Sequence, residues 1–315
     1  MIGFIVRRLL QAVVVLVGLT VFVFVLEHLI PGNLAKAILG QRASPAAIAA
    51  FNSENGLDHP LVVQYLTFLG HVVTGNLGYS YRQNQSVDSL VAHQLPNDVL
   101  LVGSSLVLSL AIAVPLGVAQ AAKRRSAFDH AATAVSFTLY SIPSYCLGLL
   151  LVAWLAIASH LFPPEAPQGA NFASVISDPR ALVLPVLTLT LVNVAYFSRY
   201  MRSSAIATLA EDYVRLAKAK GLGRRKVIWH HVLRNSLLPV VTLVGLSLPA
   251  VLTAGLIIED VFNFPGVGLT YYNAAVNADY PVMLGITVLV GLTTVIGSLL
   301  ADLAYAVLDP RVRYV

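Results

Sequence analysis

The sequence predicts an all-α, polytopic membrane protein with six transmembrane helices, both termini cytoplasmic and one large external segment after the first helix. Three observations lead to this fold class. Hydrophobic residues make up 57% of the 315 residues and charged residues only 11%, whereas a soluble domain carries about 25% charged residues. Six apolar runs are each long enough to cross about 30 Å of hydrocarbon. The basic residues collect in alternate segments between these runs, which indicates an inner and an outer face.

The first span is predicted from the apolar run 9–26, which follows Arg7 and Arg8. A basic start before an apolar stretch is also typical of a signal peptide, and Ala-Lys-Ala at 35–37 resembles a cleavage site. The run is long for a signal peptide, so we interpret it as a retained helix whose N-terminal end lies inside.

Residues 31–98 form a polar interlude with few basic residues, which we place outside the membrane. Ser44-Pro45 has the pattern of an N-cap followed by proline at the first helical position, and Asn55-Gly56 that of a helix end. An apolar stripe predicts a second short helix over Leu61–Val72. A third helix is expected from a cap at Ser86 to Leu95-Pro96.

Five further spans are expected at 99–121, 132–158, 182–203, 237–258 and 282–307. Prolines interrupt several of them, which is tolerated where neighbouring helices satisfy the freed backbone groups. In this arrangement sixteen of the twenty lysines and arginines fall in inner segments and four in outer ones. That excess predicts that both termini are cytoplasmic and that residues 1–315 form a single transmembrane domain.

Residues 204–236, between the fourth and fifth spans, are predicted to form a cytoplasmic helical hairpin. Nine basic residues lie between Arg199 and Arg234, against two acids. Apolar residues recur at helical spacing from Ile206 onward, and Gly221 and Gly223 are expected to end this first helix. A second short helix, 224–235, leads into the fifth span. Two interpretations stay open: a basic loop that only fixes orientation, or a docking surface for a soluble partner.

No motif for catalysis or for a cofactor is present. The chain has no His-Glu-x-x-His pair, no Gly-x-Ser-x-Gly elbow and no lysine directly after a glycine, which excludes a Walker-type phosphate loop. We therefore expect no catalytic residue, metal site or cofactor on this chain. His230 and His231 are neighbours on a helix and point about 100° apart, which favours a structural or surface role. The confinement of the basic residues to inter-span segments argues against nucleic-acid binding.

Three acidic residues lie near span ends, and two interpretations of the role of each stay open. Glu259 and Asp260 end the fifth span on the predicted outer side, either as a solvated boundary pair or as a contact for a cationic substrate or an outer partner. Asp302 is the only acid clearly inside the last span, where an ionisable residue is a candidate for function. It also lies close enough to the inner boundary to pair with Arg311 or Arg313.

The hairpin resembles the EAA loop of ABC-transporter permeases, with Ala217, Gly221 and Leu238-Pro239 at the matching positions. Arg215 stands where the general loop has a glutamate, and the gap from Gly221 to Leu238-Pro239 is longer than usual. Both departures are similar to the dipeptide/oligopeptide/nickel subfamily. The segments that carry this resemblance are Asp212-Tyr213-Val214, Ala219-Lys220-Gly221-Leu222 and Leu233-Arg234-Asn235-Ser236-Leu237-Leu238-Pro239.

The resemblance extends over nearly the whole chain and is to the B-type subunit of that subfamily. Further matching segments are Pro31-Gly32-Asn33, Gly56-Leu57-Asp58, Gln64-Tyr65-Leu66, Gly75-Asn76-Leu77-Gly78, the glycine- and proline-containing stretch 259–268, and the C-terminal stretch 308–314. Asn33 and Asn76 stand where members often have aspartate, so any role of those charges is absent here.

This resemblance implies a transmembrane permease subunit of an ATP-driven peptide importer in the bacterial cytoplasmic (inner) membrane. The implied partners are a second homologous permease subunit, two cytoplasmic ATPase subunits that bind ATP and Mg, an external substrate-binding protein and the lipid bilayer. The residues implied to couple the chain to the ATPase are Asp212, Tyr213, Arg215, Ala217, Lys218, Gly221, Leu222 and Gly223.

Several functional alternatives remain at this stage. The same resemblance also admits a permease for nickel chelates or another small solute. A channel or receptor that needs no ATPase is a further alternative. The external segment 31–98 is expected either to cap the pathway and contact the binding protein or to be a passive lid. No residue of the substrate pathway is assigned by spacing.

Overall fold

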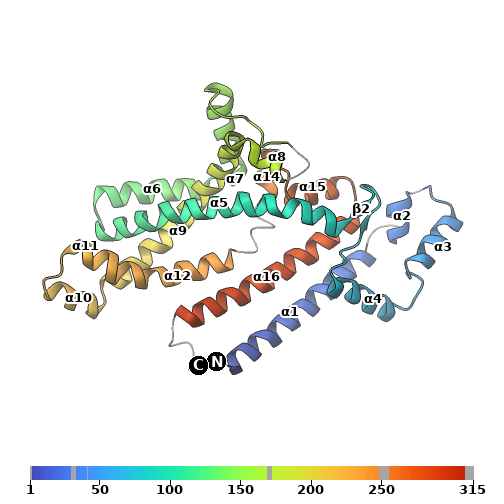
Figure 1. Cartoon of the computed structure of the whole chain (residues 1–315), viewed down its shortest axis with the longest axis horizontal. Coiled ribbons are helices and arrows are strands. Elements are labelled where there is room, and N and C mark those ends of the chain that lie inside the picture. The colour runs from blue at the N-terminus through green and yellow to red at the C-terminus, as the bar shows by residue number, and fades with distance from the viewer. Residues whose placement is uncertain (1, 30–32, 41, 169–171, 248–254, 309–315) are drawn as a thin grey trace.

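The structure is a computed structural model that describes residues 2–29, 33–40, 42–168, 172–247 and 255–308. It is an elongated helical bundle, with α10 and α11 at one end and α2 to α4 at the other (Figure 1). The helices are α1 (Ile2–His28), α2 (Asn33–Leu39), α3 (Pro45–Glu54), α4 (Leu61–Thr74), α5 (Val87–Ala122), α6 (Ala127–Ser141), α7 (Ser144–Leu151), η1 (Val152–Ala158), α8 (Phe172–Ser177), α9 (Pro179–Leu209), α10 (Asp212–Ala219), α11 (Arg224–Lys226), η2 (Val227–Val232), α12 (Leu233–Leu246), α14 (Leu256–Val261), α15 (Val267–Val276) and α16 (Tyr280–Leu308). The described strands, β1 (Tyr79–Ser80) and β2 (Gln85–Ser86), form one short antiparallel pair.

The all-α, polytopic fold class is confirmed. Within the described residues, five helical stretches are long and apolar enough to cross a membrane, and a bent pair makes a sixth if it counts as one span. The five are 6–28, 87–122, 179–209, 224–245 and 280–300. Each overlaps one of the spans expected from the sequence.

Three predicted boundaries were wrong. The run 132–158 is not one straight span, because the chain bends by 102° between α6 and α7, at Ile142-Pro143; proline cannot donate a backbone hydrogen bond there. The helix expected to stop near Pro96 continues through that residue as part of the 36-residue α5. The second helix of the hairpin does not end at 235 but runs without a break through η2 into α12.

The fifth span, expected at 237–258, also differs from its prediction. Helix α12 ends at Leu246, and the separate helix α14 begins at Leu256. Most of the intervening stretch, 248–254, lies outside the described residues, and so does the proline expected to interrupt that span. The described residues of this apolar run therefore belong to two separate helices.

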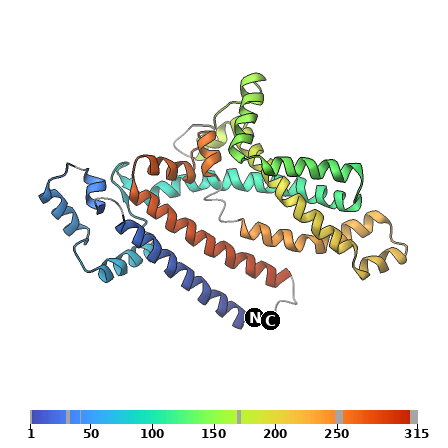
Figure 2. The same cartoon turned by 180° about the vertical axis from the view of Figure 1, so that it is seen from behind.

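The bundle is organised around the contact between α5 and α9. Gly117 of α5 lies against α9 so closely that an added Cβ would be 2.7 Å from the Ser198 carbonyl oxygen and from the Met201 Cβ. Helix α6 packs on α9, whereas α12 and α1 both pack on α16. Figure 2 shows α1 and α16 side by side from behind, as in Figure 1. Because glycine has no side chain, it permits the close approach of α5 to α9.

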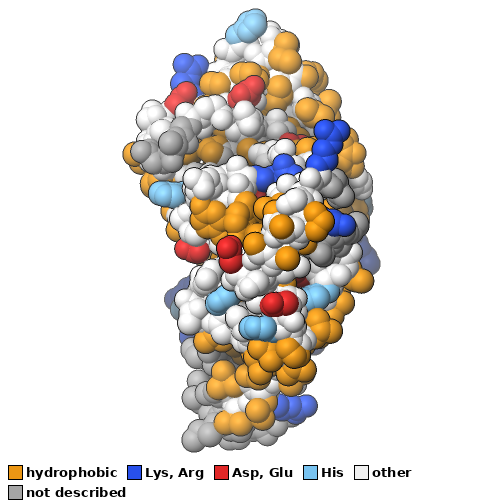
Figure 3. All heavy atoms as spheres, turned by 90° about the vertical axis from the view of Figure 1, so that its right-hand side faces the viewer, with side chains coloured by type: hydrophobic (Ala, Val, Ile, Leu, Met, Phe, Trp, Pro, Cys, Tyr) orange, Lys and Arg blue, Asp and Glu red, His pale blue; other side chains and the backbone are white. Residues whose placement is uncertain are grey.

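Helices α2 to α4 follow α1 and project from the end of the bundle opposite to α10 (Figure 1). The predicted cap is confirmed, because the Ser44 side chain accepts a hydrogen bond from the Ala47 amide and Pro45 is the first helical residue. Helix α4 rests on α1 through the Tyr65 and Thr20 hydroxyls, 3.0 Å apart. Figure 3 views this side of the molecule, where apolar side chains reach the surface among histidines and acids.

Candidate functional site

The hairpin of residues 204–236 contains a short helix set off from its neighbours. Helix α9 ends at Leu209, and α10 begins anew at Asp212 after an extended Glu211. The single helix expected from Ile206 to Lys220 is therefore wrong, because the chain turns at Ala210 and Glu211. The result is an eight-residue helix, α10, lying at the end of the bundle between α9 and α11 (Figure 1).

Gly221 ends α10 in the way the sequence predicts. Its φ of +78° is in the left-handed region, which glycine adopts without steric cost. The Leu222 amide donates to the Ala217 carbonyl at 3.3 Å and the Gly221 amide to the Lys218 carbonyl at 3.0 Å. This closing pattern is a Schellman-type helix end. Gly223 differs from its prediction, because its φ of −58° is ordinary and it precedes α11 rather than ending α10.

The inner side of α10 is held by a small apolar core. Val214 and Ala217 are buried and pack in one cluster with Ala121 of α5, Ala205 of α9 and Val227 of η2. Leu222 is half-buried against the same cluster. This core packs α10 closely against α5, α9 and η2.

The outer side of α10 presents a mixture of apolar and charged side chains. Tyr213 is 40% exposed and Leu216 is 55% exposed, and Lys220 is exposed as well. Among the implied coupling residues, Asp212, Arg215 and Lys218 are exposed too. Ala217 is buried, so its contribution is to packing within the chain. A soluble partner would meet Tyr213, Leu216 and the surrounding charges.

Two hydrogen bonds fasten the hairpin to the helices behind it. The Asn235 side chain donates to the Tyr213 hydroxyl at 2.8 Å, which links α12 to α10. The Arg224 guanidinium donates to the Ala122 carbonyl at 2.6 Å, which caps the end of α5. The Asp212–Arg215 pair, 3.4 Å apart, is exposed on both sides and contributes little to stability.

A bidentate ion pair lies next to the hairpin. Arg202 of α9 donates to both carboxylate oxygens of Asp129 in α6, at 2.6 and 2.8 Å, and the Arg125 amide donates to Asp129 at 2.9 Å. The Asp129 side chain is only 4% exposed. Paired charges in this geometry form strong, directional contacts. Sequence reasoning counted Arg202 only as a basic residue and missed Asp129, although Ser126 three residues earlier indicates a helix start.

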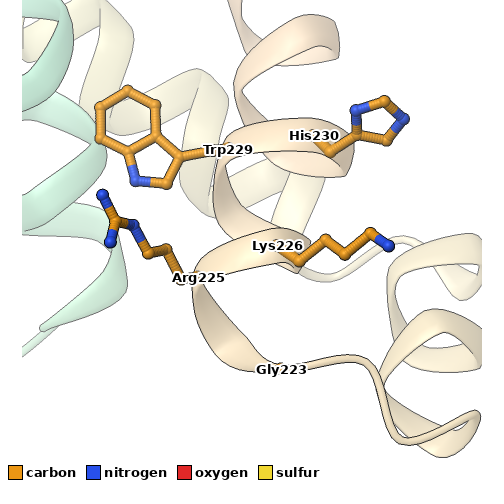
Figure 4. Close-up of a pocket in the computed structure, with 5 residues that line it drawn as sticks. All are labelled: Gly223, Arg225, Lys226, Trp229 and His230. Atoms are coloured by element: carbon orange, nitrogen blue, oxygen red, sulfur yellow. The ribbon is translucent and has the colours of Figure 1, made fainter.

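A shallow depression of about 820 Å³ lies beside α11. It is lined by Gly223, Arg225, Lys226, Trp229 and His230. Figure 4 shows Trp229 and Arg225 on one side of the helix and Lys226 and His230 on the other. Trp229 is 51% exposed. Tryptophan and arginine are enriched at protein–protein interfaces, whereas lysine is depleted there.

At the opposite end of the bundle a second polar cluster surrounds Gly266. Asp98 accepts from the Val267 amide at 3.2 and 3.1 Å, and Glu259 accepts from the Leu269 amide at 2.8 Å. Both acids are completely buried. Burial raises the pKa of the Glu259 carboxyl above its usual range, while hydrogen bonds from backbone amides act in the other direction. These carboxylates satisfy the free amides at the start of α15.

This arrangement corrects the interpretation of Glu259 and Asp260 as a solvated boundary pair. Asp260 is exposed, but Glu259 is buried and structural. Sequence reasoning missed Asp98, which lies inside α5 and carries no motif of its own. Asp302 belongs to α16, but its side chain is not described, so its role stays a prediction.

The described residues contain no group of three or more His, Cys, Asp or Glu side chains placed to hold a metal ion. His230 and His231 stack edge to face with ring centroids 5.2 Å apart. The candidate spans among the described residues are those of a multi-pass membrane protein.

Comparison with known proteins agrees with this class. Residues 113–314 match the family described as binding-protein-dependent transport system inner membrane component, and residues 1–102 match its N-terminal domain. The chain therefore belongs to this family of transport permeases.

Several relatives match the chain over its full length. The oligopeptide transport system permease protein AppB of Bacillus subtilis is 36% identical, with all of both chains covered. A putative peptide permease protein of Brucella suis is 38% identical over 99% of each chain. The dipeptide transport system permease protein DppB of Escherichia coli K12 is 32% identical over 100% of this chain and 99% of its own.

Proposed function

We propose that this chain is a permease subunit of an ATP-driven peptide importer and forms half of its transmembrane pathway. The observation that carries the proposal is the full-length similarity to relatives named as oligopeptide and dipeptide permeases, at 32–38% identity. A shared substrate class is favoured because the similarity covers the whole chain and not the hairpin alone.

The proposed topology places both termini and the hairpin in the cytoplasm and residues 31–98 outside. The uneven distribution of lysine and arginine supports this orientation. The membrane is the bacterial cytoplasmic (inner) membrane, in keeping with the family description. The external helices α3 and α4 then lie where a substrate-binding protein would dock.

The proposed mechanism has α10 seated in a groove of a cytoplasmic ATPase subunit. Two such ATPases, which bind ATP and Mg, serve this chain and a second, homologous permease subunit. When the ATPases close, α10 moves, and its apolar core transmits the movement to α5, α9 and η2. The pathway then opens alternately to the two sides. Exposed ion pairs contribute only about 0–1 kcal/mol each, so Tyr213 and Leu216 provide most of the docking energy.

The experiment is reconstitution of the complete transporter in proteoliposomes, with its substrate-binding protein included in the uptake assay. Uptake of radiolabelled di- and oligopeptides that requires ATP supports the proposal. The same vesicles are tested with a nickel chelate and with ATP omitted. Uptake of the nickel chelate but not of peptides would show that the substrate is a nickel chelate. Uptake without ATP would indicate a channel.

A further inference from the structure

A second cavity, of about 390 Å³ and partly open to the surface, lies between α5, α6 and α9, beside Arg202. Its volume is in the range of small-molecule binding sites. Its walls include Gln120, Phe137 and Arg199 together with the rings of Tyr140, Tyr196 and Tyr200. Nothing in the coupling mechanism above uses these side chains.

Arg199 lies in α9, one of the candidate membrane-spanning helices, near the end of that helix that leads into the hairpin. Its guanidinium lies over the Phe137 ring at 4.4 Å and over the Tyr140 ring at 4.9 Å. Among the described residues it has no carboxylate within ion-pair distance, unlike Arg202 three residues later. Stacking on two rings holds the guanidinium plane and leaves its N–H groups available.

The Arg199 side chain extends away from the hairpin, which is the direction of the α9 N-terminus and the usual tilt of helical side chains. Asp129 pairs with Arg202, and Ser136 lies 3.4 Å from Ser198, so α6 and α9 run antiparallel. The Arg199 guanidinium contacts the rings of Phe137 and Tyr140. Both rings lie farther from the hairpin than the Arg199 backbone does. At 1.5 Å per residue, Tyr140 lies about 20 Å along α6 from Ala127. A snorkelling arginine would point the other way.

Gln120 supplies an independent observation from the opposite wall. Its side chain is only 1% exposed. The amide nitrogen donates to the Thr133 hydroxyl at 3.3 Å, whereas the amide oxygen Oε1 has no partner among the described residues. A buried acceptor without a donor is costly and requires an explanation. An N–H donor from a ligand would satisfy it.

We propose, on the basis of the peptide-importer function above, that this cavity binds the carboxyl-terminal end of a peptide in transit. Arg199 pairs with the terminal carboxylate, and Gln120 Oε1 accepts a hydrogen bond from a peptide N–H. The tyrosine and phenylalanine rings contact the peptide side chain. The terminal residue of a peptide carries a carboxylate and an N–H on the same Cα and so can engage both groups, whereas a bare anion or cation engages only one.

The test is equilibrium binding to the purified permease–ATPase complex without its binding protein. The probe is radiolabelled trialanine with a free carboxyl terminus, and the competitor is trialanine amide. Wild type is expected to bind the free acid at least about tenfold more tightly than the amide, because only the free acid forms a charge-assisted hydrogen bond with Arg199. Arg199→Gln is expected to weaken free-acid binding by about tenfold and to abolish the preference. Gln120→Leu is expected to weaken both peptides equally.

Controls separate this inference from folding and from the proposed function. Arg199→Lys keeps the charge and is expected to restore part of the preference, and Arg124→Gln removes an exposed charge nearby and is expected to bind as wild type does. Equal binding of both peptides by wild type, or a normal preference in Arg199→Gln, would overturn the cavity assignment while peptide uptake in proteoliposomes continues. Absence of ATP-driven peptide uptake by wild type would instead overturn the proposed function.

Discussion

Replacing Gly221 by alanine tests whether the hairpin must keep its shape. Any residue with a Cβ at φ +78° is strained by about 1–2 kcal/mol. No atom lies within 4 Å of the added methyl group, so a clash contributes nothing and the strain is the whole effect. That cost lowers the ratio of native to rearranged turn by about 5–30-fold. Because the turn ends α10, we expect ATP-driven peptide uptake to fall several-fold.

The assay is peptide uptake by proteoliposomes, with the amount of inserted permease measured on the same samples. Gly223→Ala is the matched control, because Gly223 is equally open but has an ordinary φ of −58°. We expect Gly223→Ala to retain most of the uptake and both variants to insert normally. Equal uptake by the two variants would refute the argument that the backbone at Gly221 shapes the coupling helix.

Three further substitutions test the packing behind the hairpin and at the opposite end. Asp129→Asn breaks the bidentate pair and is expected to destabilise the complex by about 1.5–3 kcal/mol. Calorimetry of the double variant with Arg202→Gln should show a loss of stability smaller than the sum of the two single losses. Strict additivity would contradict the pairing. Gly117→Ala forces α5 away from α9 and is expected to lower the unfolding temperature, while Gly103→Ala in the same helix has open space and is expected not to. Gly266→Ala places a methyl group against two buried carboxylates, so we expect little folded protein on size-exclusion chromatography, and a normal yield would argue against the buried cluster.

Much of the helical layout could be predicted because apolar length and charge placement determine spans directly. The cap at Ser44 and the stop at Gly221 were local signals, and the structure confirms both. The bend at Pro143 was not predictable with certainty from composition, because a proline in a span either kinks the helix or is absorbed by it. Pro96 and Pro115 are absorbed within α5, whereas Pro143 divides its run.

Of the candidate functional residues, some could be predicted from the sequence and others could not. The hairpin was identified because its charge and glycines are contiguous in the sequence. Asp98 and Glu259, by contrast, meet from helices far apart in the chain, and each alone looks like a boundary acid. Arg199 and Gln120 likewise meet only in the folded bundle. The apolar spacing that begins at Ile206 does not continue in phase through α10, because the helix restarts at Asp212: Tyr213 is exposed, whereas Val214 and Ala217 are buried.

The central claim, that α10 is the contact through which a cytoplasmic ATPase moves this permease, is tested most directly by cross-linking. A photoreactive amino acid is placed at Leu216, which is 55% exposed on α10, and separately at Val73, which is 79% exposed on α4. After irradiation of the assembled transporter in membranes, the account predicts a product between position 216 and the ATPase subunit and none from position 73. Failure of position 216 to reach the ATPase, or cross-linking of it to the external binding protein, would contradict the account.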